Sequence, residues 1–170
     1  MTIRFGILTL SDRSSRGERA DESGPALSNL IRAEGWSVVR QELLPDDESS
    51  IRVSLANWAD SGDMDVILTT GGTGFAPRDV TPEAVKPLFR REMDGFSALF
   101  HQASFGTVGF STLQSRAFAG QIDDTFIFCL PGSTGACRDG WDLVLKFELD
   151  SRYRPCSLAG QVPRLRHLCA

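Results

Sequence analysis

The sequence predicts an α/β fold: a single domain in which a mostly parallel β-sheet carries helices on its faces. Over the first 70 residues, short apolar segments rich in β-branched residues alternate with segments of helical apolar spacing, in the order β-α-β-α-β. The connections are short, which in such units implies parallel strands joined by right-handed crossovers. With 170 residues, 41% hydrophobic and 24% charged, the chain has the size and composition of one compact soluble domain.

Three strands are expected in the first half of the chain, at residues 3–10, 36–43 and 66–70. The polar segment 11–15 that follows the first strand is expected to be a loop. A helix should begin near Ser23-Gly24-Pro25, because Ser23 or Gly24 can cap it and proline suits a first helical turn. Gly35 is placed to end that helix before the second strand.

A second helix is expected between the second and third strands. Either Asp46 or Asp47 can cap its N-terminus, and the apolar spacing of Ile51, Leu55 and Trp58 defines its buried face. Both aspartates therefore have a structural explanation that involves no ligand.

The second half of the chain contains shorter signals. Thr81-Pro82 is typical of a helix start, and Pro87 should keep that helix short. Another helix is expected from Asp94, a strand at residues 125–130, and a helix capped by Ser133. The segment 106–120 has no clear pattern. We expect residues 1–155 to form the domain and residues 156–170 to form an irregular C-terminal arm.

Charge, cysteines and the N-terminal sequence exclude several classes of protein. A net charge of −4 argues against a nucleic-acid-binding face. The four cysteines form no C-x-x-C pair, so a zinc site or a disulfide framework is not expected, and Cys129 reads as a buried small hydrophobe. The chain begins without a signal-peptide pattern and has no apolar run long enough to span a membrane, which makes the cytoplasm the expected location.

A glycine-rich loop follows the central predicted strand, in the sequence Val66-Ile-Leu-Thr-Thr-Gly-Gly-Thr-Gly74. Glycines permit positive φ and the close approach of another molecule, and free N–H groups in such a loop suit phosphate oxygens. The order of glycines matches neither a P-loop nor the dinucleotide fingerprint. Taken alone, the loop could equally be a tight turn without a ligand.

Polar residues follow four predicted strands, at the edge of the sheet where α/β proteins bind ligands. They lie in Ser11-Asp12-Arg13, Pro45-Asp46-Asp47, the glycine loop with Arg78-Asp79, and Pro131-Gly132-Ser133. Mg²⁺ takes one or two carboxylates together with phosphate oxygens, so Asp46 and Asp79 are the candidate metal ligands for a phosphorylated substrate. The alternatives are a helix cap for Asp46 and, for Asp79, a surface carboxylate paired with Arg78.

The two histidines, His101 and His167, lie outside these loops, and no serine has a visible histidine partner. The chemistry should therefore need no imidazole base. Transfer of a phosphoryl or nucleotidyl group to an existing phosphate fits this requirement, because that nucleophile is already an anion.

Four motifs together resemble the molybdenum cofactor biosynthesis proteins of the molybdopterin adenylyltransferase type: Leu68-Thr-Thr-Gly-Gly-Thr-Gly74, Arg78-Asp-Val-Thr-Pro82, Ser115-Arg116 and Leu130-Pro-Gly132. The resemblance runs from about residue 3 to about residue 155. It implies a three-layer α/β/α fold and assembly as a homotrimer or a hexamer. It also implies Mg²⁺-dependent reaction of ATP with molybdopterin, giving adenylyl-molybdopterin and pyrophosphate, and a partner protein that inserts molybdenum.

The resemblance assigns roles to individual residues. Asp46 and Asp79 match the carboxylates tied to catalysis, and Ser115 and Arg116 match pterin or phosphate contacts. No tightly bound metal is expected. The positions expected to bind the nucleotide and its phosphates are Ser11, Asp12, Gly71, Gly72, Thr73, Gly74, Pro131, Gly132 and Ser133.

One departure concerns the branch of the family. The catalytic branch continues Leu-Pro-Gly with Asn-Pro or Gln-Pro, whereas this chain continues Ser133-Thr-Gly-Ala-Cys-Arg138, which resembles the protein B branch. A paralogue that binds nucleotide or pterin without catalysis is therefore the alternative function. A purely structural trimer would not explain the polar strand ends. Retention of both Asp46 and Asp79 favours an enzyme.

Overall fold

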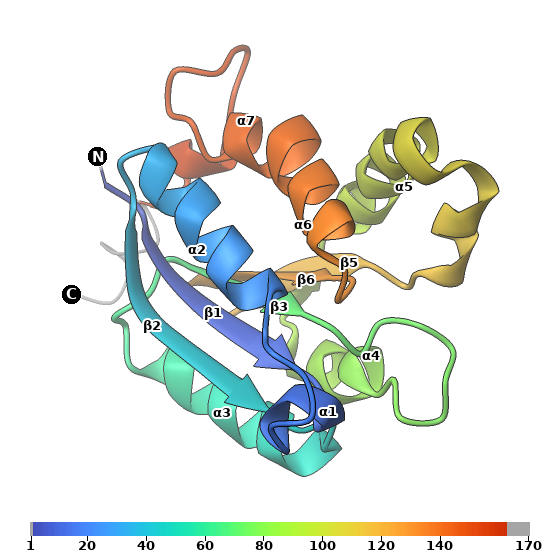
Figure 1. Ribbon diagram of the computed structural model, residues 1–170. Helices are drawn as coiled ribbons and strands as arrows, with labels where there is room; N and C mark the ends of the chain where they lie inside the picture. The colour runs from blue at the N-terminus through green and yellow to red at the C-terminus, as the bar shows by residue number, and fades with distance from the viewer. Residues whose placement is uncertain (1, 163–170) are drawn as a thin grey trace.

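The computed structural model of the chain describes residues 2–162, and in these residues a six-stranded sheet is enclosed by helices (Figure 1). The strand order is β2-β1-β3-β6-β5-β4. The first four strands are parallel, β5 is antiparallel to β6, and β4 is antiparallel to β5. The strands are β1 (Arg4–Leu10), β2 (Ser37–Leu44), β3 (Val66–Thr70), β4 (Arg91–Glu92), β5 (Phe118–Ile122) and β6 (Thr125–Leu130).

The helices form one layer on each face of the sheet, which confirms the predicted three-layer architecture. One layer contains α2 (Ser23–Ala33), α5 (Asp94–Val108), α6 (Thr134–Gly140) with its continuation through a π-helical turn (Trp141–Leu145), and α7 (Lys146–Glu148). The other contains α3 (Glu48–Asp60) and α4 (Thr81–Val85). The 3₁₀ segments are η1 (Lys86–Leu88), η2 (Gly109–Gln114) and η4 (Leu158–Gly160).

Two hydrophobic cores separate the three layers. Side chains alternate along β3, so that Val66 and Leu68 join the core beneath α2, α5 and α6, while Ile67 joins the core beneath α3 and α4. The same alternation occurs along β6, where Phe128 and Cys129 point to opposite cores. Both faces of β3 and β6 are buried, which explains why their sequences read as continuous apolar runs.

Cys129 is fully buried, as predicted, and burial raises the pKa of its thiol to about 12. The thiol therefore stays protonated at neutral pH and contributes packing rather than chemistry.

The segment after β1 is a helical turn, which corrects the prediction of a loop at residues 11–15. Residues Asp12–Ser15 form α1, and the Ser11 hydroxyl oxygen accepts a hydrogen bond from the N–H of Ser14 at 3.2 Å. A capping serine ahead of a single polar turn satisfies the first N–H groups without any apolar stripe. Hydrophobic periodicity therefore gives no sign of this helix.

The sheet contains two strands that the sequence pattern did not predict, β4 and β5. β5 begins in the segment without a clear pattern and is joined to its partner β6 by the two-residue connection Asp123-Asp124, where Asp123 has a φ of 46°. A side chain on Gly120 would collide with the ring of Phe89, so glycine is needed there for close packing. Small residues and continuous burial hide the alternation that would otherwise mark β5.

The start of the predicted irregular arm packs against the domain. Ala159 and Val162 are buried in the core beneath α2 and α6, and residues 158–160 form one 3₁₀ turn. His167 and the remainder of the arm lie outside the described residues. Within residues 2–162, no helix combines the length and the hydrophobicity needed to cross a membrane.

Asp47, not Asp46, caps α3. Its carboxylate accepts the N–H of Ser50 at 2.8 Å and the hydroxyl hydrogens of Ser49 and Ser50 at 2.7 and 2.6 Å. These hydrogen bonds hold the pKa of Asp47 at about 2, below the usual 3.8. Asp46 therefore does not cap α3, which was one of the two explanations that the sequence allowed for it.

We expect Asp47→Ala to lower the melting temperature at pH 7, because it removes the cap. A carboxyl whose folded pKa is depressed stabilises the fold above its unfolded pKa and loses that contribution as pH falls towards its folded pKa. The difference between wild type and Asp47→Ala should therefore shrink between pH 4 and pH 2. Thermal denaturation followed by circular dichroism would measure it, and a difference that is constant with pH would contradict the assignment.

Candidate active site

A polar cavity of about 520 Å³ lies beyond the carboxyl ends of β1, β3 and β6. The chain passes from β1 outward to β2 and then returns to place β3 on the other side of β1. Such a reversal of strand order opens a crevice where α/β proteins bind ligands. Eleven predicted site residues line the cavity: Ser11, Asp46, Gly71, Gly72, Thr73, Gly74, Asp79, Ser115, Pro131, Gly132 and Ser133.

The glycine loop is fixed from two sides. Gly71 has a φ of 110° and Gly72 a φ of 65°, and a Cβ on Gly71 would collide with the carbonyl of Leu10. The hydroxyl of Thr81, at the start of α4, donates to the carbonyl of Gly71 at 2.8 Å, and the N–H of Thr81 donates to that of Gly72 at 3.0 Å. Only glycine suits this backbone.

The loop also presents unused hydrogen-bond donors. The N–H of Gly71 donates to the carbonyl of Leu130 at 3.0 Å. The N–H groups of Gly72, Thr73 and Gly74 have no protein acceptor within residues 2–162. Consecutive N–H groups of this kind bind the oxygens of an anion.

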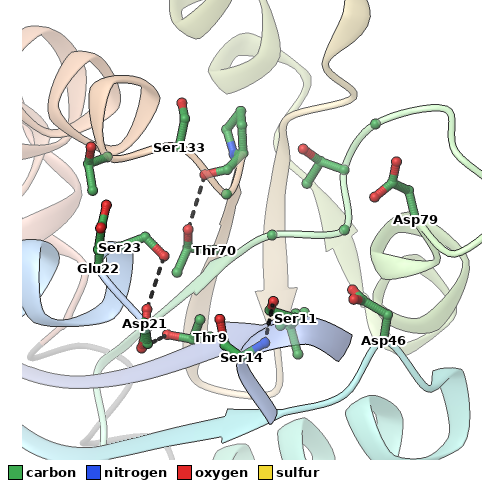
Figure 2. A pocket seen from close by; sticks show the side chains of 18 of the residues that line it. Thr9, Ser11, Ser14, Asp21, Glu22, Ser23, Asp46, Thr70, Asp79 and Ser133 are labelled. Atoms are coloured by element: carbon green, nitrogen blue, oxygen red, sulfur yellow. Dashed lines mark hydrogen bonds between the residues drawn. The ribbon is translucent and has the colours of Figure 1, made fainter. Parts of the chain in front are cut away.

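Asp79 lies against the end of this loop (Figure 2). Its carboxylate oxygen Oδ2 accepts the N–H of Ala76 at 2.9 Å. A Cβ added to Gly74 would lie 2.6 Å from the same oxygen. The small size of Gly74 therefore makes room for the Asp79 carboxylate, and the structure gives no positive φ at this position.

We expect Gly74→Val to displace Asp79 and to damage the site, because the added side chain would occupy the place of the carboxylate. The affinity for Mg²⁺-ATP, measured by calorimetry, should fall by about tenfold or more, as for the loss of a charged contact. Gly135→Val is the comparison, since a Cβ at Gly135 meets nothing within 4 Å. Equal affinities for wild type and Gly74→Val would contradict the role of the loop.

Asp46 lies beside Gly72 of the same loop, where a Cβ added to Gly72 would be 3.0 Å from its Oδ1, and it is paired with Asp12. The N–H of Asp12 donates to Oδ2 of Asp46 at 2.9 Å, and the N–H of Asp46 donates to Oδ1 of Asp12 at 3.1 Å. Oδ1 of Asp46 is buried without a hydrogen-bond partner among the described residues. A buried carboxylate oxygen without a partner is costly unless a ligand or cation satisfies it.

The surroundings shift the pKa values of Asp46 and Asp12 in opposite directions. Burial raises the pKa of Asp46, and the negative charges of Asp12 and Asp79 raise it further, against the N–H of Asp12 and the charge of Arg78. The Arg78 guanidinium beside Asp12 lowers the pKa of that carboxyl. Arg78 pairs with Asp12 rather than with Asp79, so the predicted alternative for Asp79 does not describe the structure.

The site has the donors that Mg²⁺ needs when phosphates supply the remaining oxygens. Asp46 offers a buried oxygen that no described residue satisfies, and Asp79 offers a second carboxylate beside the same loop. Within residues 2–162 no group of three or more histidine, cysteine, aspartate or glutamate residues is placed to hold a metal alone. Mg²⁺ usually binds through one or two carboxylates plus substrate phosphates, and the residues present fit that mode.

Arg116 does not line the cavity, and it supports the glycine loop through hydrogen bonds to backbone carbonyls. Its guanidinium donates to the carbonyls of Gly74 and Asp79 at 2.9 and 2.8 Å and pairs with Glu83. Ser115 lines the cavity, with its hydroxyl 3.5 Å from that of Thr73. In this structure the hydrogen bonds of Arg116 hold the glycine loop in place. A direct contact between Arg116 and the pterin stays a prediction.

One wall of the cavity was missed by the sequence reasoning. Asp21 accepts a hydrogen bond from the hydroxyl of Thr9 at 2.8 Å (Figure 2). It also accepts the N–H of Gly24 at 3.0 Å. Only the position of this segment, between the first strand and the first long helix, could have indicated it. The additional lining residues include Thr9, Ser14, Arg19, Asp21, Glu22, Ser23, Thr70, Gln114 and Thr134.

The described histidine takes no part in the cavity. His101 does not line it, and its Nδ1 lies 2.9 Å from the hydroxyl oxygen of Thr112. The arrangement therefore offers carboxylates, hydroxyls and backbone N–H groups, which suits the binding of a phosphorylated ligand rather than imidazole chemistry.

Comparisons with known proteins find a matching family model and similar sequences. Residues 6–151 match the family model described as "Probable molybdopterin binding domain". The molybdenum cofactor biosynthesis protein B of Escherichia coli K12 is 45% identical over 154 residues, which cover 91% of this chain and 89% of that protein. The molybdopterin adenylyltransferase of Pyrococcus furiosus is 38% identical over 147 residues, which cover 84% of this chain and 85% of that protein.

A solved structure supports the same conclusion. The crystal structure of the tungsten cofactor synthesizing protein MoaB from Pyrococcus furiosus superposes with a TM-score of 0.76 at 33% identity, covering 98% of this chain and 96% of that one. The similarity in fold and in sequence extends over nearly the whole length of the chain. The chain therefore belongs to the family of molybdenum cofactor biosynthesis proteins that contains protein B and the molybdopterin adenylyltransferases.

Proposed function

We propose that this chain, a nucleotidyltransferase of its family, uses Mg²⁺-ATP to adenylylate molybdopterin and releases pyrophosphate. One observation carries the proposal: the carboxylates of Asp46 and Asp79 lie beside Gly72 and Gly74 of the glycine loop, and Oδ1 of Asp46 is buried without a hydrogen-bond partner among residues 2–162. A metal-bound triphosphate would satisfy that oxygen and the free N–H groups of the loop at the same time.

In this reaction a phosphate oxygen of molybdopterin forms a bond to the α-phosphorus of ATP, and the bond from that phosphorus to the oxygen bridging it to the β-phosphate breaks. The nucleophile is an anion before it reacts, so no side chain has to remove a proton. The chain positions both anions: the N–H groups of Gly72, Thr73 and Gly74 donate to phosphate oxygens, and Ser11 and Ser133 line the same cavity.

Asp46 and Asp79 would hold Mg²⁺. When bound, the ion would supply positive charge that offsets the charge of the triphosphate and of the departing pyrophosphate. Burial and the neighbouring carboxylates raise the pKa of Asp46. A nearby cation favours the ionised form of such a group.

The direct test is pyrophosphate release by the purified protein on mixing with ATP, Mg²⁺ and molybdopterin. We expect release that stops when Mg²⁺ is chelated and returns when Mg²⁺ is added back. Calorimetric titration with Mg²⁺ and a non-hydrolysable ATP analogue should be run in parallel. Binding without any turnover would replace the enzyme with the paralogue that binds nucleotide or pterin.

We further propose that the chain assembles as a homotrimer or hexamer in the cytoplasm and works with a partner that inserts molybdenum. The exposed apolar side chains of Phe110 and Leu113, which are 85% and 80% exposed on η2, support a self-associating surface. Light scattering should report a mass of at least three chains in dilute solution. A purely monomeric mass would contradict the assembly.

A further inference from the structure

We propose that Arg78 is a positioning residue for this site, one that acts through Asp12 to hold Asp46 and the segment carrying Asp79 in their working arrangement. The inference rests on the proposed function and adds a role for a residue that lines neither the cavity nor the core.

The first support is a continuous set of bonds from Arg78 to Asp46. Nε of Arg78 donates to Oδ2 of Asp12 at 2.8 Å, and its second nitrogen donates to Oδ1 at 3.0 Å, which makes a two-point ion pair. Asp12 then exchanges two hydrogen bonds with Asp46, one in each direction. These bonds orient the Asp46 carboxylate, whose Oδ1 has no hydrogen-bond partner in the part of the chain that the structure describes.

The second support is the place of Arg78 in the chain. Residues 75–78 are exposed and contain no helix or strand, so the backbone that carries Asp79 depends on contacts at its ends. Arg116 binds the carbonyls of Gly74 and Asp79 at the two ends of the segment. Arg78 provides a further contact by joining the segment to α1.

The third support is that the ion pair between Arg78 and Asp12 adds little to the stability of the fold. The Arg78 side chain is 64% exposed, and an exposed ion pair contributes little to stability. Asp12, by contrast, is 18% exposed and lies beside the site. A small misplacement of catalytic groups can lower a rate by about 100-fold even when the fold is unchanged.

Arg78 could instead contact a phosphate of the substrate directly, and a double-mutant cycle separates the two roles. We expect Arg78→Gln and Asp12→Asn each to lower kcat/KM for Mg²⁺-ATP by about 10- to 100-fold. If Arg78 acts through Asp12, the double variant should be no slower than the slower single variant. Losses that multiply would overturn the proposal, because they would mean that the two residues act independently.

A measurement that needs no catalysis completes the test. Loss of the ion pair should speed hydrogen exchange at the amides of Asp12 and Asp46 by about five- to tenfold, followed by peptide-level mass spectrometry of the Arg78→Gln variant. Unchanged exchange at both amides would overturn the proposal. Arg152→Gln is the matched control, since Arg152 is an exposed arginine that forms a two-point ion pair with Asp150, at 3.0 and 2.9 Å, and does not line the cavity.

The outcome stays separate from that of the proposed function. If the wild-type protein binds nucleotide but shows no turnover, the same cycle is read in the dissociation constant for Mg²⁺ with the non-hydrolysable ATP analogue. Coupled losses of affinity together with faster amide exchange would then support the positioning role in a binding protein. Additive losses of affinity would reject it.

Discussion

Replacing Asp79 by asparagine is expected to lower the rate of pyrophosphate release by about 10²–10³-fold and to leave the fold intact. Asparagine keeps the shape of the side chain and can still accept the N–H of Ala76. It loses the negative charge that a Mg²⁺ ligand supplies. Pyrophosphate release at saturating Mg²⁺-ATP and molybdopterin measures the effect, and the melting temperature reports on the fold.

Asp63→Asn is the control for Asp79→Asn. Asp63 is exposed and lies just before β3, at the edge of the sheet opposite the cavity, so the same loss of charge should leave the rate unchanged. An active wild type with an equally active Asp79→Asn variant would remove Asp79 from the catalytic set. A loss of melting temperature that parallels the loss of rate would assign the effect to the fold.

Asp46→Asn is expected to change activity and stability in opposite directions. Activity should fall by about 10²–10³-fold, because an amide cannot replace the carboxylate charge toward a cation. Stability at pH 7 should rise, because burial makes the ionised Asp46 unfavourable in the folded state. A variant that is both inactive and less stable would show that Asp46 acts in the fold instead.

The pH dependence of that stability change follows from the sign of the pKa shift. The folded pKa of Asp46 is raised, so its ionisation destabilises the native state as pH rises above the ordinary value of 3.8. The gain in melting temperature of Asp46→Asn over wild type should therefore be present at pH 7 and absent below about pH 3.8. Thermal scans of both proteins between pH 3 and pH 7 test this, and a gain that persists at pH 3 would contradict it.

Local sequence patterns predicted the parts of the fold that local physics determines. The strands at residues 66–70 and 125–130 are buried on both faces, and their apolar β-branched or aromatic runs are clear without knowledge of the partners. β5 contains Gly120, whose small size depends on what packs above it. That requirement is set by Phe89 from another segment and leaves no periodic signal.

The residues of the candidate site that directly follow a strand could be predicted from the sequence, and those that do not follow a strand could not. Gly71 and Asp46 follow predicted strands, and the parallel order brings those ends together. Asp21 follows no strand, and only the path of the chain between β1 and α2 brings its carboxylate to Thr9. The sequence also could not decide between Asp46 and Asp47 as the cap of α3, because both precede the helix and only backbone geometry separates them.

The two outermost strands determine how this molecule can associate. An open sheet edge is a template on which another chain can add a strand. One edge here is β4, only two residues long, and the other is β2, which carries the charged side chains of Arg40 and Glu42. Arg40 also lies 4.9 Å from the ring centre of Trp58. Both edges therefore disfavour strand-to-strand growth, and contacts between copies of this chain should form through helical surfaces.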